Sequence, residues 1–142
     1  MKLAATLTFT SDVHQLARVR EFVATTAFSL TNDLNAIDDL VLALTEAVTN
    51  VIVHSYRQNP GPIRVEVGLA PDQLIILLTD EGPPYDPTGA PTPDTTLPLD
   101  QRQPGGLGIH MMRHLTDELR YQRTSDGKNQ LSLIKFIRGD EK

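Results

Sequence analysis

The start of the chain alternates between apolar and polar positions in a way that predicts a strand and then a helix. From residue 3 to residue 9, apolar residues fall on every second position, which is the period of a half-buried strand. Ser11-Asp12 then supplies a helix cap before Val13, Leu16, Val19 and Val23, which are apolar residues of the predicted helix. The chain therefore opens with a strand that leads into a helix.

A second and longer helix is predicted between residues 33 and 56. Thr31-Asn32-Asp33 is its cap signal, and Asn59-Pro60-Gly61-Pro62 forces a turn after about Tyr56. On a helical wheel its apolar residues form one wide stripe that must face a sheet. The stripe consists of Ile37, Leu40, Val41, Leu44, Val48 and Val51.

The rest of the periodic sequence predicts strands around one more helix. Residues 63–69 alternate and residues 74–78 are apolar throughout, so a hairpin with a central second strand is expected. A helix follows at about 107–115, then strands at about 118–123 and 130–137. We therefore expect one α+β domain over residues 1–142. It should be a two-layer sandwich in which helices cover one face of a mixed, mostly antiparallel sheet.

The segment from about 83 to 104 has neither period. It contains seven of the ten prolines, with threonine and aspartate between them. A loop of this length inside a compact domain is typically a functional lid or a disordered segment. We expect a flexible, proline-rich lid here.

Composition removes several classes of function. The longest apolar run, residues 74–78, is too short to cross a membrane, and the start of the chain has no apolar segment long enough for a signal peptide. The absence of cysteine excludes disulfides and thiolate metal sites. With a net charge of −5 and scattered basic residues, nucleic acid is not an expected partner. The cytoplasm is the expected compartment.

Glu46 and Asn50 are the first candidate functional pair. They are four residues apart on the second helix, so their side chains share a face opposite the apolar stripe. Leu42 and Val53 flank them, and we expect this face to be covered by other parts of the protein. A carboxylate beside a carboxamide suits Mg²⁺ chemistry, because Asn offers a neutral oxygen ligand and Glu can deprotonate a hydroxyl group. A solvated polar face is the alternative interpretation.

Asp80 and Gly82 form the second candidate group. Asp80 ends the apolar strand, and a carboxylate there is costly unless it finds hydrogen-bond donors. The functional interpretation is that Asp80 accepts a hydrogen bond from an exocyclic amine such as that of adenine. Gly82 would then let the backbone approach the ring. A strand-ending acidic turn with local partners explains the same residues.

The third group is Gly105-Gly106-Leu107-Gly108, which leads directly into the predicted helix at 107–115. Free amide groups and the positive end of the helix dipole favour a phosphate at such a position. The sequence matches neither a P-loop nor a dinucleotide-binding fingerprint. A flexible hinge at the end of the lid is the alternative.

In this order, the three groups resemble the N, G1 and G2 boxes of the GHKL ATPase superfamily, whose domain is the histidine-kinase-like, or Bergerat, sandwich. The match is most similar to the bacterial anti-sigma factor serine/threonine kinases. It rests on Leu44-Thr45-Glu46-Ala47-Val48-Thr49-Asn50 with His54 and Tyr56, Asp80-Glu81-Gly82-Pro83-Pro84-Tyr85-Asp86-Pro87, and Gly105-Gly106-Leu107-Gly108.

The resemblance implies that Asn50 holds Mg²⁺, that Glu46 is the general base for a seryl or threonyl hydroxyl, and that Asp80 binds adenine. Gly82 and Tyr85 would belong to the base pocket. Gly105, Gly106, Leu107 and Gly108 would lie at the phosphates, and Arg102 would neutralise transferred charge unless it is simply solvated. Many relatives place a threonine after the final turn where this chain has Asn129, so Asn129 is the candidate for that part of the adenine network.

The resemblance also implies a function and partners. The first hypothesis is an ATP- and Mg²⁺-dependent serine/threonine kinase that phosphorylates a STAS-type anti-sigma factor antagonist, works as a homodimer and can also sequester a sigma factor. A second is an ATP-gated binding module without kinase activity. A third is the ATP-binding half of a sensor histidine kinase, but no phosphoacceptor helix pair precedes the domain.

Overall fold

The computed structural model describes residues 1–56, 59–89 and 106–137. Strands and helices follow one another in nearly the predicted positions. The strands are β1 (Lys2–Thr10), β2 (Pro62–Ala70), β3 (Gln73–Asp80), β4 (Glu118–Arg123) and β5 (Asn129–Phe136). The α-helices are α1 (Leu16–Leu30), α2 (Leu34–Asn50) and α3 (Gly106–Leu115). Short helical segments are η1 (Val13–Gln15), η2 (Val51–Tyr56) and η3 (Pro87–Gly89).

The five strands form one sheet in the order β1-β2-β3-β5-β4. All four pairings are antiparallel, so the expectation of a mixed sheet is wrong in that detail. A parallel pair needs a long crossover connection, whereas β2–β3 and β4–β5 are hairpins and β5 returns beside β3 in the opposite direction. The predicted central position of β3 is confirmed, and its last residue, Asp80, pairs with Asn129 at the beginning of β5.

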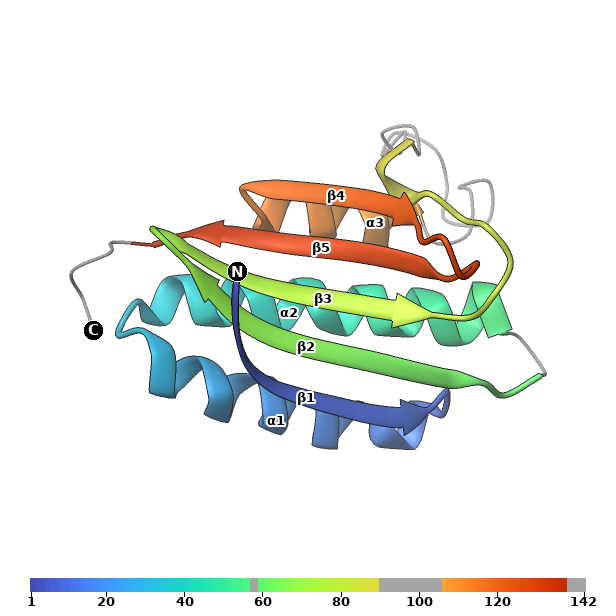
Figure 1. Cartoon of the computed structure of the whole chain (residues 1–142), viewed down its shortest axis with the longest axis horizontal. Coiled ribbons are helices and arrows are strands. Elements are labelled where there is room, and N and C mark those ends of the chain that lie inside the picture. Colours follow the sequence, from blue (N-terminus) through green and yellow to red (C-terminus); the bar gives the residue numbers. More distant parts are fainter. Residues whose placement is uncertain (57–58, 90–105, 138–142) are drawn as a thin grey trace.

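The three helices cover one face of the sheet, with α2 between α1 and α3 (Figure 1). The core lies between these two layers. Its sheet side comes from alternate residues such as Ile63 and Val65 of β2 and Ile76 of β3, all at most 1% exposed. Its helix side is the predicted stripe of α2, of which Leu40 and Leu44 are also at most 1% exposed. The predicted α+β sandwich is therefore confirmed.

Helix α2 begins at the predicted cap, because the Asp33 side chain accepts a hydrogen bond from the amide of Ala36 at 3.1 Å. Its α-helical part ends at Asn50, and residues Val51–Tyr56 continue as the π-helix η2. The predicted end near Tyr56 is confirmed, although the wider turn was not predicted. A π-helical turn frequently marks a functional site.

One expectation about α2 is wrong. Leu42 and Val53, which flank Glu46 and Asn50, are each 51% exposed instead of covered. Helices α1 and α3 lie on the two sides of α2 (Figure 1), and neither covers Leu42 and Val53. In residues 1–56, 59–89 and 106–137 there is no helix with the length and apolar character that a membrane span requires.

Candidate active site

A narrow cavity lies between α2 and the edge of the sheet where β3 ends and β5 begins. Its polar lining consists of Asn50, Ser55, Asp80, Tyr85, Tyr121 and Asn129, and the rest of the lining is apolar. The free volume of the cavity is about 20 Å³, which is room for about one water molecule.

Asp80 is one of the buried residues that line this cavity, with 5% of its surface exposed. Its Oδ1 accepts hydrogen bonds from the Gly82 amide at 2.9 Å and from Asn129 Nδ2 at 3.0 Å. No described residue donates a hydrogen bond to Oδ2. The carboxylate is thus held through one oxygen, and the other is available to an amine of a ligand.

Asn129 connects Asp80 with the turn that follows it and with β4. The residue is 4% exposed, and its carboxamide takes part in six hydrogen bonds. Nδ2 donates to Asp80 Oδ1 and to the carbonyl oxygens of Gly82 (3.3 Å) and Pro83 (2.9 Å). Oδ1 accepts from Tyr121 (2.6 Å), Arg123 (3.1 Å) and the amide of Tyr85 (3.4 Å).

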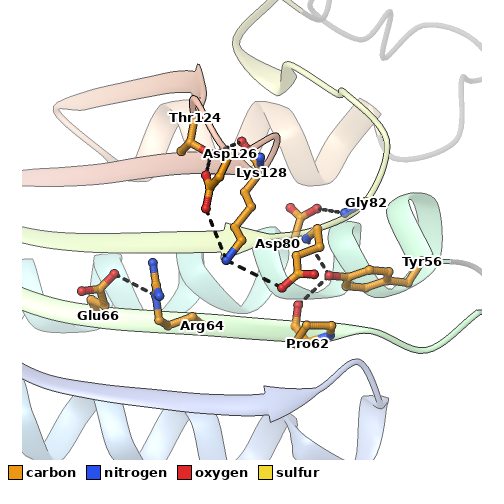
Figure 2. A network of polar contacts seen from close by, with 10 residues as sticks. Tyr56, Pro62, Arg64, Glu66, Asp80, Gly82, Thr124, Asp126 and Lys128 are labelled. Carbon is orange, nitrogen blue, oxygen red and sulfur yellow. Dashed lines mark hydrogen bonds and ion pairs between the residues drawn. The ribbon is translucent and has the colours of Figure 1, made fainter.

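Tyr56 holds the other side of the same turn (Figure 2). Its hydroxyl donates to the Pro62 carbonyl at 2.5 Å and accepts from the Glu81 amide at 2.6 Å. Burial raises the pKa of Tyr56. The hydrogen bond from Glu81 opposes this shift, while the negative charges of Asp80 and Glu81 add to it. The hydroxyl therefore stays protonated and keeps its donor role.

Lys128 reaches the turn from the β4–β5 connection (Figure 2). Its Nζ lies 3.8 Å from Glu81 Oε2 and 3.6 Å from Asp126 Oδ2. Both ion pairs are partly exposed, and exposed pairs contribute at most about 1 kcal/mol to stability. We regard Lys128 as a weak link between the two turns.

Gly82 lies against the end of η2. A Cβ at this position would be 2.8 Å from Ser55 Cβ and 3.1 Å from Asp80 Oδ1. Carbon atoms do not approach this closely, so only glycine allows the turn to pack here. The wide π-helical turn places Ser55 in the cavity lining together with Asn50 and Asp80.

Glu46 lies one helical turn before Asn50 and meets the beginning of α3. A Cβ on Gly108 would be 2.8 Å from Glu46 Oε2. Gly106 and Leu107 belong to the first turn of α3, and the amide groups at the N-terminus of a helix are a suitable place for an anion. The structure thus brings the candidate base next to the candidate phosphate site.

Most sequence-predicted site residues lie in one region. The cavity is lined by Asn50, Asp80, Tyr85 and Asn129. Gly82 lies next to it, since its amide donates a hydrogen bond to Asp80. Arg102 and Gly105, with residues 90–104 of the predicted lid, lie outside the described residues. In the described part of the chain, no three or more His, Cys, Asp or Glu side chains form a group that could hold a metal ion.

Sequence reasoning missed several residues that shape the site. Tyr121 and Arg123 lie on β4 opposite Leu131 and Asn129, so their role follows from the register of two strands, which was not predicted. Arg113 of α3 donates to the carbonyl oxygens of Pro87 (3.2 Å) and Thr88 (2.6 Å), which ties the segment after β3 to α3. No sequence motif predicts such contacts between a side chain and a distant backbone carbonyl.

The sequence matches the family model described as the histidine kinase-like ATPase domain over residues 9–135. It is 33% identical over 111 residues to "Serine-protein kinase RsbW" of Bacillus subtilis (strain 168), an alignment that covers 73% of this chain and 67% of that protein. It is 37% identical over 95 residues to "Serine/threonine-protein kinase BtrW" of Bordetella bronchiseptica, covering 66% of each protein.

A solved structure supports the same fold. The crystal structure of the RsbU and RsbW domains of Rv1364c from Mycobacterium tuberculosis aligns with 94% of this chain and 34% of that chain, with a TM-score of 0.62. The sequence identity is 20%, so this likeness concerns the fold alone.

Proposed function

The chain belongs to the histidine kinase-like ATPase family, and from that premise we propose that it transfers the γ-phosphate of ATP to a serine or threonine of a partner protein. The relatives named above are protein kinases of the serine/threonine class. What the proposal adds is the assignment of this chemistry to individual residues of this chain.

One observation carries the proposal. Asn50 and Asp80 line the same cavity, and Glu46, one turn before Asn50, lies against the first turn of α3. The amine acceptor Asp80, the oxygen ligand Asn50 and the base Glu46 thus follow one another, with the N-terminus of α3 beside the base. This is the order that adenine, phosphates and an attacking hydroxyl would need.

At the adenine end, Asp80 would accept the exocyclic amine through Oδ2, because Oδ1 is already occupied by Gly82 and Asn129. A carboxylate buried to this degree binds a donor well, since water does not compete with it. Tyr85 and the buried backbone at Gly82 would line the base pocket.

At the phosphate end, the amide groups of residues 105–108 would bind phosphate oxygens. Asn50 would contribute its side-chain oxygen to Mg²⁺, since an amide oxygen is a suitable ligand for this hard cation. When bound, Mg²⁺ neutralises charge on the phosphates. The side-chain oxygen of Asn50 therefore fits Mg²⁺, and the amide groups of the first turn of α3 fit the phosphates. Arg102 would add positive charge from the lid.

Glu46 would act as the general base. The hydroxyl oxygen of the partner forms a bond to the γ-phosphorus, the bond from that phosphorus to the bridging oxygen of ADP breaks, and the hydroxyl proton passes to Glu46. Proton transfer of this kind contributes about 10²- to 10⁴-fold to a rate. Glu46 is half-buried and has no hydrogen bond or ion pair with any described residue, so it is free to accept a proton.

We propose the partner proteins from the resemblance to the same family. The substrate would be a STAS-type anti-sigma factor antagonist, and the chain would also sequester a sigma factor. The active form would be a homodimer, and residues 83–104 would form the lid over ATP. Each of these statements rests on the resemblance of the three sequence motifs.

The test is transfer of label from [γ-³²P]ATP with Mg²⁺ to a panel of STAS-type antagonist proteins from the same genome. Acid-stable label on one serine or threonine, dependent on this chain, is the expected result. ATP binding without label on any member would instead favour the ATP-gated binding module. Label on a histidine, which acid removes, would also contradict the proposal.

A further inference from the structure

The third residue of α3 contacts the catalytic candidate on α2. A Cβ built on Gly108 would lie 2.8 Å from Glu46 Oε2 and 3.8 Å from Glu46 Cδ. Within 4 Å that Cβ would meet no other atom of the described residues, apart from its own helix and chain neighbours. The space that a side chain at position 108 would need is therefore taken by one carboxylate.

The backbone does not explain glycine at this position. Gly108 lies inside α3, and Gly127 is the positive-φ glycine among the described residues. Any L-residue can adopt the helical conformation of Gly108, and glycine is less favourable than alanine inside a helix. Presenting an amide group to a phosphate also needs no glycine, because every residue except proline has that group.

No polar contact with a described residue fixes the side chain of Glu46. Its carboxylate has no hydrogen bond or ion pair to a described residue, so a new methyl group at position 108 would push it aside at little cost in stability. For proton abstraction the displacement matters much more. A shift of about 1 Å in a reacting group can reduce a rate about 10²-fold.

We propose that Gly108 is a positioning residue for Glu46. Its missing side chain provides the space in which the carboxylate can lie while it accepts the proton of the attacking hydroxyl. This role is separate from the binding of phosphate by the amide groups of the same turn. The inference rests on the proposed kinase function. It predicts that a side chain at position 108 lowers the rate of phosphoryl transfer without weakening ATP binding.

The experiment compares wild type, Gly108→Ala and His110→Ala in ATP binding and in phosphoryl transfer to the antagonist protein that wild type labels. His110 is an exposed residue two positions further along α3 and serves as the matched control. For Gly108→Ala we expect an unchanged fold by circular dichroism and an ATP affinity within about threefold of wild type, because the amide group remains. The kcat of transfer should fall about 10²-fold with little change in KM for ATP.

A second comparison places the same change in a Glu46→Gln background. In the Glu46→Gln protein there is no base to displace, so moving the side chain at position 46 should not lower the transfer rate further. Adding Gly108→Ala should therefore change the residual transfer rate of Glu46→Gln by no more than about twofold. Equal losses in both backgrounds would show that Gly108 acts independently of Glu46.

The remaining outcomes are also decisive. A fall in ATP affinity that matches the fall in kcat would assign Gly108 to the phosphates alone, and unchanged transfer would also overturn the inference. If wild type itself labels no antagonist, the proposed function fails and removes the basis of the inference. If wild type labels its partner while Gly108→Ala behaves like His110→Ala, only the inference fails.

Discussion

Asn129 determines how Asp80 is presented to a ligand. Its donor fixes Asp80 Oδ1, while its acceptor takes hydrogen bonds from β4 and from Tyr85. A threonine at this position has no second donor that could reach both Asp80 and the Pro83 carbonyl. The structure therefore assigns to Asn129 a wider role in this network than the sequence motif suggested.

Asn129→Asp tests this role with almost no change in shape. The new carboxylate has no N–H group to donate. One of its oxygens would take the place of Asn129 Nδ2, which lies 3.0 Å from Asp80 Oδ1, so two buried carboxylates would repel each other. We expect a loss of about 2–4 kcal/mol in unfolding free energy, measured by urea denaturation, and at least about tenfold weaker ATP binding. Gln130→Glu, the neighbouring amide on the other face of the sheet, should change both much less.

Asp80→Asn should separate nucleotide binding from folding. The Asn oxygen can still accept hydrogen bonds from Gly82 and Asn129, but the second Asp80 oxygen becomes an amino group that repels the adenine amine. Calorimetry should show ATP affinity reduced by more than about 100-fold, since a buried donor then faces another donor. Glu81→Gln is the matched control. Unchanged affinity for Asp80→Asn would refute the adenine assignment.

Tyr56 should make the protein sensitive to alkaline pH. Its folded-state pKa is raised, so its contribution to stability is fully present below the unfolded value of 10.0 and is lost as pH rises through the folded pKa. Tyr56→Phe removes this titration and leaves two backbone groups without a partner. It should cost about 1–3 kcal/mol at pH 8 and flatten the decline above pH 10. Equal slopes in the two proteins would contradict the account.

At the scale of elements, the junction of α2 with η2 sets the geometry of the cavity. The α-helical part orients Glu46 and Asn50, and the π-helical turn then brings Ser55 against Gly82. Two elements far apart in sequence thus meet with no space for one extra methyl group. Two side chains hold the turn after β3 in this position: Asn129 donates a hydrogen bond to the Pro83 carbonyl, and the Tyr56 hydroxyl accepts one from the Glu81 amide.

Gly82→Ala should disturb this junction. Its Cβ would meet Ser55 Cβ, an atom fixed to the backbone, so the turn or η2 must shift. We expect a loss of about 1–3 kcal/mol in unfolding free energy together with weaker ATP binding. Adding Ser55→Gly removes the opposing atom, and the cost of Gly82→Ala should be smaller in that background. Strict additivity of the two changes would show that this contact does not matter.

At the scale of the whole molecule, periodicity alone predicted the elements and the helix-covered sheet. The alternation in β1 and β2 and the stripe on α2 record burial on one side, which is why these predictions were accurate. The antiparallel pairing of every strand and the exposure of Leu42 and Val53 depend on how elements are placed around each other. Local sequence does not contain that information.

The candidate site divides in the same way. The motifs predicted Glu46, Asn50 and Asp80 because two of them share one face of a predicted helix and the third ends an apolar strand, where a carboxylate is costly without donors. The glycines were predicted because they lead directly into a helix. Tyr121 and Arg123 could not be predicted, since they reach the site only through the register of β4 with β5. The contact of Gly108 with Glu46 likewise depends on the packing of α3 against α2.

The most direct test of the whole account is a single-turnover comparison of wild type with Glu46→Gln, in which ATP affinity and the rate of transfer to the antagonist are measured on the same samples. Glutamine keeps the size of the side chain and removes the base. We predict ATP affinity within about threefold and a transfer rate lower by about 10²- to 10⁴-fold. Transfer by Glu46→Gln at the wild-type rate would contradict the claim that Glu46 makes this ATP site a kinase.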